Sequence, residues 1–233
     1  MKTAAIVTGA SSGIGLAISR MLCEKGYEVF GFGRTFTAEW TDERFHPVVC
    51  DITDTNRACT EIKTIEKAYA ITILVNNAGV GYYGLHEELN PAKIKEMVRT
   101  NLEAPMIFSN ILLRTLKANH GWVINVSSVT AEEANPHGCA YGATKAGLSS
   151  FSRSLFEEAR KYGVKVVNVQ PDMTQTNLYR NADFKEDEDK MAHLLPEDVA
   201  SAVAYALEQP EGTVVTEFTI RPQLHRIKRK RRE

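Results

Sequence analysis

Short apolar segments rich in Val and Ile recur along the chain, and segments with helical periodicity separate them. The apolar segments do not alternate with polar residues, which is typical of strands buried on both faces of a parallel sheet. Repeated strand–helix units predict an α/β fold, a doubly wound, Rossmann-like parallel sheet in a single domain. We expect strands at residues 4–8, 27–32, 48–50, 71–75, 122–126, 164–169 and 213–220. We expect helices at residues 13–25, 56–70, 101–118, 141–162 and 197–208.

The composition fits a folded domain with a charged end. Hydrophobic residues make up 43% of the 233-residue chain and charged residues 24%, which excludes wholesale disorder, and no apolar run has the length of a membrane span. The net charge is −1, yet residues 221–233 carry seven Lys or Arg and one acid. We therefore predict a domain at 1–220 and a basic C-terminal tail at 221–233. Because the tail has little apolar content, we expect residues after about 225 to be mobile or bound to a partner.

A glycine-rich loop joins the first predicted strand to the first predicted helix. Its sequence is Thr8-Gly9-Ala10-Ser11-Ser12-Gly13-Ile14-Gly15. Glycine there permits a tight turn and lets the backbone approach a pyrophosphate at the helix N-terminus, so the loop indicates a dinucleotide site. A loop that uses glycine only to turn is the alternative. Asn76-Asn77-Ala78-Gly79 follows the fourth strand and suits a cofactor at the same edge of the sheet, with an ordinary turn as the alternative.

The end of the second strand bears on which nicotinamide cofactor would bind. NAD sites usually carry an acid about 20 residues after the glycine-rich loop. Here the strand ends in Gly31-Phe32-Gly33 and Arg34 follows, so a guanidinium replaces the expected carboxylate. Arginine can hold a 2′-phosphate through two parallel hydrogen bonds, which favours NADP(H) over NAD(H). A solvated loop arginine is the alternative.

Three residues in the second half of the chain are suited to proton transfer. Tyr141 and Lys145 are four residues apart, so a helix brings them to one face, where the ammonium would lower the pKa of the phenol. Tyr141 would then serve as a general acid or base near neutral pH. Ser128 follows the fifth strand and can donate to a substrate oxygen. An exposed helical pair is the alternative for the Tyr–Lys spacing taken alone.

Together and in this order, these motifs resemble the compact single-domain branch of the short-chain dehydrogenase/reductase family, over about residues 3–220. The resemblance implies that Ser128 orients a carbonyl, that Tyr141 exchanges a proton with it, and that Asn101 supports a proton relay. It implies a double role for Lys145, on the nicotinamide ribose and on the pKa of Tyr141. The cofactor-binding residues that it implies are Gly9, Ser11, Ser12, Gly13, Ile14, Gly15, Arg34, Asp51, Ile52, Asn77, Ala78, Gly79, Tyr141, Lys145 and Thr176.

Other features lie where the family places its substrate. Asp172 stands where the family usually has glycine, which bears on the charge of the substrate. We expect residues 177–195 to cover the substrate, and Tyr82, Tyr83 and Cys139 either to line the pocket or to pack. Within that segment, Asp187-Glu188-Asp189 is interpreted as a solvated helical face.

The sequence thus predicts an NADP(H)-dependent oxidoreductase that interconverts a carbonyl and a secondary alcohol on a small metabolite by hydride transfer, without a metal site. The rival prediction is a non-catalytic NADP-binding regulator whose basic tail contacts a polyanion or a partner; nucleic acid is not favoured for the chain as a whole. Four cysteines without a CxxC pair, and a start at Met1 without a secretion signal, predict a cytoplasmic protein with no membrane partner. The helix predicted at 101–118 is apolar on two faces, which predicts a homo-dimer or homo-tetramer.

Overall fold

A computed structural model of the chain describes residues 1–37 and 40–230. Its main sheet has seven parallel strands in the order β3-β2-β1-β4-β5-β6-β8. These strands are β1 (Lys2–Thr8), β2 (Glu28–Gly33), β3 (Phe45–Val49), β4 (Tyr69–Asn76), β5 (Trp122–Val126), β6 (Lys165–Pro171) and β8 (Glu217–Ile220). The predicted doubly wound parallel sheet is confirmed. The last strand, expected to begin at residue 213, is shorter than predicted.

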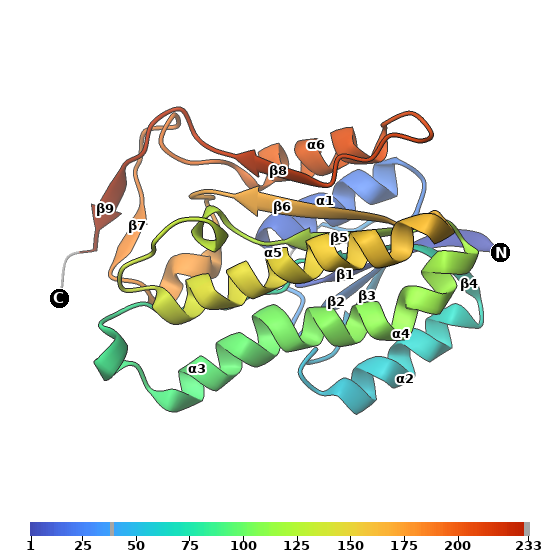
Figure 1. The fold of residues 1–233 in the computed structure, drawn as a ribbon, viewed down its shortest axis with the longest axis horizontal. Coiled ribbons are helices and arrows are strands. Elements are labelled where there is room, and N and C mark those ends of the chain that lie inside the picture. Colours follow the sequence, from blue (N-terminus) through green and yellow to red (C-terminus); the bar gives the residue numbers. More distant parts are fainter. Residues whose placement is uncertain (38–39, 231–233) are drawn as a thin grey trace.

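Helices cover both faces of this sheet (Figure 1). They are α1 (Gly13–Glu24), α2 (Thr55–Glu66), α3 (Pro91–Val98), α4 (Ala104–Ala118), α5 (Cys139–Ala159) and α6 (Pro196–Leu207). On one face, α2, α4 and α5 bury apolar side chains such as Ile62, Phe108 and Leu155. On the other face, α1 and α6 bury Leu22 and Val203. The order of strands reverses between β1 and β4, which opens a crevice at their carboxyl ends.

The structure corrects two helix boundaries. The helix expected at 56–70 ends at Glu66, because Tyr69 and Ala70 already belong to β4 and pair with β1. The patterns above do not predict α3, although its start carries clear signals. Asn90 caps α3 by accepting a hydrogen bond from the Ala92 N–H at 2.8 Å, and a proline occupies the first helical position.

A π-helical turn at Arg99–Glu103 joins α3 to α4, so the helix expected from Asn101 begins at Ala104. Pro105 lies in the first turn of α4, where it is tolerated, and it has no N–H to donate to the carbonyl four residues earlier, at Asn101. The wider turn accommodates this missing donor. It also leaves the Asn101 side chain buried against α5.

A second, two-stranded antiparallel sheet lies at one end of the molecule (Figure 1) and consists of β7 (Phe184–Glu186) and β9 (Ile227–Arg229). Because β9 belongs to the basic tail, the described part of the tail packs on the segment before α6 as far as residue 230, whereas the sequence predicted residues after about 225 to be mobile or bound to a partner. The acidic residues 187–189 form no helical face; two of them pair with tail cations. Residues 231–233 lie outside the described part. None of the described helices has the length and apolarity needed to cross a bilayer.

Candidate active site

A cavity of about 380 Å³ opens at the carboxyl ends of the central strands. Motifs that are far apart in the sequence meet in it. It is lined by most of the predicted site residues: Gly9, Ser11, Ser12, Gly13, Ile14, Arg34, Asp51, Ile52, Asn77, Ala78, Gly79, Ser128, Tyr141, Lys145 and Thr176. Two predicted site residues, Gly15 and Asn101, lie behind the lining instead of on it.

The glycine-rich loop is held close to the loop that follows β4. Gly9 has a φ of +66°, and a Cβ on it would lie 2.8 Å from the Ala78 Cα, so this position requires glycine. A Cβ on Gly15 would lie 2.3 Å from the Gly9 carbonyl oxygen, so Gly15 permits the packing of α1 on the loop. Asn77 Nδ2 donates to the Thr8 carbonyl at 2.9 Å, and Thr8 Oγ1 accepts from the Asn77 N–H at 3.0 Å. These contacts fix the two loops as one cradle.

The N-terminus of α1 faces this cradle. Its N-cap residue, Ser12, makes no side-chain hydrogen bond to the first turn of the helix. The first N–H groups of α1 therefore have no side-chain cap, and a bound phosphate would satisfy them.

Arg34 and Asp51 line the cavity beyond the glycine-rich loop. Asp51 Oδ1 accepts hydrogen bonds from the N–H of Thr53 at 2.9 Å and from its hydroxyl at 2.8 Å. Burial opposes the charge of Asp51, but these hydrogen bonds and the guanidiniums of Arg34 and Arg99 outweigh it and lower the pKa of that carboxyl. Arg34 is exposed at the cavity, so its guanidinium can reach an anion bound there.

Ser128, Tyr141 and Lys145 come together from the end of β5 and the first turns of α5, and all three are buried. Lys145 Nζ donates to the Val126 carbonyl at 2.8 Å and lies 5.8 Å from the centre of the Tyr141 ring. Tyr141 forms a side-chain hydrogen bond with Ser128. A phenol, a hydroxyl and an amine thus converge on one point of the cavity.

Burial controls the protonation of both titratable groups. It raises the pKa of Tyr141 to about 12, and the hydrogen bond with Ser128 opposes this effect. It lowers the pKa of Lys145 to about 8, because the charged form loses its hydration. The expected lowering of the Tyr141 pKa by Lys145 is not found in this structure, where the amine donates to a backbone carbonyl. At neutral pH the phenol therefore holds its proton and can donate it.

Asn101 lies behind the cavity, and its amide is fully engaged. Its Oδ1 accepts from the Val80 N–H at 2.9 Å, and its Nδ2 donates to the Val80 carbonyl at 2.9 Å and to Thr144 Oγ1 at 3.1 Å. The side chain thus fixes the loop after β4 against α5. Its part in a proton relay stays a prediction.

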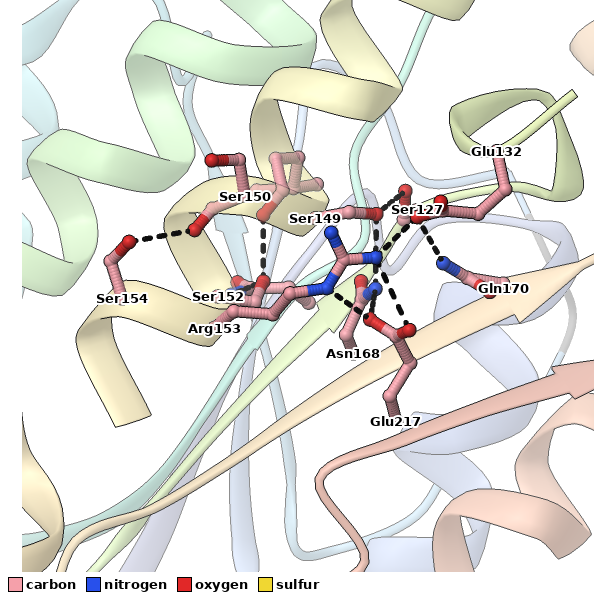
Figure 2. Close-up of polar contacts among 12 residues, drawn as sticks. Ser127, Glu132, Ser149, Ser150, Ser152, Arg153, Ser154, Asn168, Gln170 and Glu217 are labelled. Atoms are coloured by element: carbon pink, nitrogen blue, oxygen red, sulfur yellow. Dashed lines mark hydrogen bonds and ion pairs between the residues drawn. The ribbon is translucent and has the colours of Figure 1, made fainter. Parts of the chain in front are cut away.

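A chain of buried hydrogen bonds fixes α5 on the sheet beside these residues (Figure 2). Ser127 Oγ donates to the Lys145 carbonyl at 2.9 Å and is 2.9 Å from Ser149 Oγ. On β6, Asn168 Nδ2 donates to Ser149 Oγ at 3.0 Å. The network reaches the surface through ion pairs among Glu132, Arg153 and Glu217. Because these links join α5 to β5 and β6, they hold Lys145 at a fixed position relative to Ser128.

Tyr141 belongs to a cluster of four aromatic rings, with Tyr83 at its centre. The ring of Tyr83 lies 5.7 Å from that of Tyr141, 6.2 Å from that of Tyr179 and 5.2 Å from that of Phe184. Tyr179 and Arg180 line the cavity; that residues 177–195 cover a substrate stays a prediction.

Some cavity residues were not predicted from the sequence, and three candidates, Tyr82, Tyr83 and Cys139, do not line the cavity. Glu96 and Thr100 line the cavity, but α3 and the π turn that carry them were not predicted. The asparagine–proline pair at 90–91 is the signal that would have found them. Cys139 is exposed in a separate open groove at the start of α5 and does not line the cavity.

Comparisons with known proteins agree with this geometry. The family model of short chain dehydrogenases matches residues 3–187. An uncharacterized oxidoreductase of Staphylococcus epidermidis is 32% identical over 225 residues, which cover 94% of this chain and 96% of the relative. A probable NADP-dependent dehydrogenase of Haemophilus influenzae is 31% identical over 237 residues, with 94% and 93% covered.

A solved structure is similar along nearly the whole chain. It is an alcohol dehydrogenase from the archaeon Thermococcus sibiricus, complexed with 5-hydroxy-NADP, and it superposes with a TM-score of 0.84 at 27% identity, over 97% of this chain and 98% of that one. On its sequence, its fold and the residues that meet in its cavity, the chain belongs to the short-chain dehydrogenase/reductase family of oxidoreductases.

Proposed function

We propose that this chain is an NADP(H)-dependent oxidoreductase that interconverts a carbonyl and a secondary alcohol on a small metabolite. One observation carries the proposal: Ser128, Tyr141 and Lys145 line the same cavity as the glycine-rich loop. A protein that only sensed a dinucleotide would not need a buried phenol and a buried amine at this place.

The residues that line the cavity suit a dinucleotide. A Cβ on Gly13 would lie 3.1 Å from Thr176 Cγ2, so the loop and Thr176 approach each other across the cavity. The loop and the start of α1 would hold the pyrophosphate, and Asp51 and Ile52 the adenine. Lys145 would hold the nicotinamide ribose and Thr176 the carboxamide. When bound, this cofactor supplies or accepts a hydride.

The preference for NADP(H) rests on Arg34. Its exposed guanidinium at the cavity suits a 2′-phosphate, and the carboxylate typical of NAD sites is absent from the end of β2. The NADP-dependent relative from Haemophilus and the NADP analogue in the Thermococcus structure are consistent with this preference.

The protein's own groups handle the proton. In the reducing direction, Tyr141 donates its phenolic proton to the carbonyl oxygen while the Ser128 hydroxyl donates a hydrogen bond to the same oxygen. In the oxidising direction, the phenolate accepts the proton of the alcohol. Because burial keeps the phenol protonated at neutral pH, the cofactor-free site is prepared for reduction.

The test is NADPH consumption with a panel of carbonyl compounds, followed by Tyr141→Phe on the best substrate. Loss of general acid catalysis typically lowers the rate by about 10²–10⁴-fold. We expect that loss in Tyr141→Phe with unchanged NADPH affinity, and no loss in the control Tyr205→Phe, whose ring is 62% exposed on α6. Near-normal turnover in Tyr141→Phe would refute the role of Tyr141 as proton donor. If none of the carbonyl compounds leads to NADPH oxidation by the wild type, the proposed activity is refuted.

The rival function, a regulator with a polyanion-binding tail, gains no support from the contacts of the tail residues that the structure describes, 221–230. Arg226 and Lys228 pair with acidic residues of this chain, and Lys230 donates to backbone carbonyls. The interconversion of a carbonyl and an alcohol needs no polyanion.

We also propose a cytoplasmic homo-oligomer. The apolar side chains of Val98 and Met106, near the junction of α3 and α4, are 42% and 37% exposed, which suits a contact with a second copy. All four cysteines are free, as is usual in a reducing compartment. Light scattering of the purified protein tests the assembly, and the mass of a single chain would refute it.

A further inference from the structure

The described end of the basic tail contacts the wall of the cavity. In the β7–β9 sheet, Phe184 pairs with Arg229, and the Lys230 N–H donates to the Asp183 carbonyl at 2.7 Å. The side chain of Phe184 packs on Tyr83 and Tyr179, with ring centres 5.2 and 5.4 Å away. The tail therefore braces the strand that holds one of the rings beside Tyr141.

Lys230 makes a second contact, with the cavity lining itself. Its ammonium donates to the Tyr179 carbonyl at 2.7 Å and to the Arg180 carbonyl at 3.3 Å. Both residues belong to the short 3₁₀ helix Asn177–Asn181, and both line the cavity. A lysine near the end of a helical turn satisfies carbonyls that have no partner further along the helix.

The other tail contacts are weaker. Lys228 Nζ lies 2.9 Å from Glu188, and Arg226 lies 3.5 Å from Asp189, but these side chains are between 37% and 78% exposed. Exposed ion pairs contribute about 0–1 kcal/mol and are screened by salt. Two of the tail cations described touch residues of the cavity: Arg221 lies 3.8 Å from Asp172, and Lys230 contacts the 3₁₀ helix Asn177–Asn181.

We propose that Lys230 and β9 are positioning elements of the substrate cavity: they hold an aromatic wall beside Tyr141, in which Tyr179 lines the cavity and Tyr83 and Phe184 pack against Tyr179. The inference rests on the proposed function, since it takes the cavity as a substrate site. It also specifies the substrate class, because the ring of this wall that lines the cavity, Tyr179, favours a carbonyl compound that carries a flat apolar group.

The experiment compares two diketones, diacetyl and its phenyl-bearing analogue acetylbenzoyl, in wild type, Lys230→Ala, Lys230→Arg and a chain that ends at Arg226. We expect Lys230→Ala to raise KM for acetylbenzoyl about fivefold, with kcat and NADPH affinity within about twofold of wild type. KM for diacetyl should change by less than about twofold, since the smaller molecule does not reach the wall. Lys230→Arg should restore most of the loss, and the shortened chain should show at least the loss of Lys230→Ala.

Lys228→Ala is the matched control, since it removes a tail lysine that pairs only with exposed Glu188; we expect both KM values within about twofold of wild type. An unchanged KM for acetylbenzoyl in Lys230→Ala, or an equal rise for both diketones, overturns the proposal.

A measurement without turnover separates this proposal from the proposed function. Hydrogen exchange of the β7 amides, residues 184–186, should be faster in Lys230→Ala than in Lys228→Ala. Equal exchange in the two variants overturns the positioning role whether or not the wild type reduces either diketone. If the wild type reduces no carbonyl at all, the proposed function fails while the exchange result still stands.

Discussion

The buried ammonium of Lys145 should lower the free energy of unfolding of this protein. Burial lowers its pKa from 10.5 to about 8, so the folded state binds the proton less tightly than the unfolded state. One pKa unit corresponds to about 1.4 kcal/mol, which makes the destabilisation about 3 kcal/mol at neutral pH. Lys145→Met removes this effect but leaves the Val126 carbonyl without its donor, a loss of about 1 kcal/mol. We therefore expect Lys145→Met to be inactive and about 2 kcal/mol more stable than wild type at pH 7.

The dependence on pH makes this prediction specific. Below pH 8 both states hold the proton, so the full difference between variant and wild type is present. Between pH 8 and 10.5 the unfolded state binds more protons, so the wild type gains stability as the pH rises and the difference disappears. For a chain of this length about 2 kcal/mol corresponds to about 4–8 °C in Tm.

The measurement is urea unfolding of the cofactor-free proteins, followed by circular dichroism at pH 7 and pH 10. The control is Lys63→Met, in which an exposed lysine of α2 is replaced and no gain is expected. This prediction is refuted if wild type and Lys145→Met have the same free energy of unfolding at pH 7, or if the difference between them does not become smaller at pH 10. Either result would show that burial of the Lys145 ammonium does not destabilise the folded protein.

Three further predictions concern the cofactor, the proton and the substrate. Arg34→Asp should reverse a preference for NADPH over NADH in direct titrations, since the lost charged contact is worth about 1.5–3 kcal/mol; equal affinities in the wild type would remove Arg34 from the site. Because the pKa of Tyr141 is raised to about 12, kcat/KM for alcohol oxidation should rise about tenfold per pH unit from pH 7 to 9, and a flat profile would contradict the phenol as base. Asp172 lines the cavity; its side chain is 11% exposed and lies 3.8 Å from Arg221. Because a carboxylate attracts a cation and repels an anion, Asp172→Asn should reduce the preference for cationic aminoacetone over anionic pyruvate. An unchanged ratio of the two kcat/KM values would show that the Asp172 carboxylate does not act on the substrate.

The sequence predicted the parts of the molecule that local chemistry determines. Strands buried on both faces show as unbroken apolar runs, and Gly9 and Gly15 of the loop are required by backbone contacts that no side chain could share. The proximity of Tyr141 and Lys145 was predictable because a spacing of four on one helix brings the two residues together wherever the helix lies.

Features that depend on distant partners were not predictable in this way. Glu188 pairs with Lys228 and Asp189 with Arg226, which lie 40 and 37 positions further along the chain, and no local pattern in the sequence predicts these contacts. The pKa of Tyr141 depends on which acceptor Lys145 finds, and the spacing of the two residues does not reveal that this is the Val126 carbonyl.

The position of the two ends of the chain has a practical consequence for anyone who fuses this protein to another. All strands of the main sheet are parallel, so β1 begins at the edge opposite the cavity, and Figure 1 shows the start of the chain at the far end of the molecule from β7 and β9. An affinity tag or reporter attached before Met1 is carried away from the chemistry. The same tag attached at the other terminus follows Lys230 closely, and we expect it to disturb the pairing of β9 with β7, which braces the aromatic wall. Two preparations that differ only in where the tag was placed should therefore give different substrate ranges from one and the same fold.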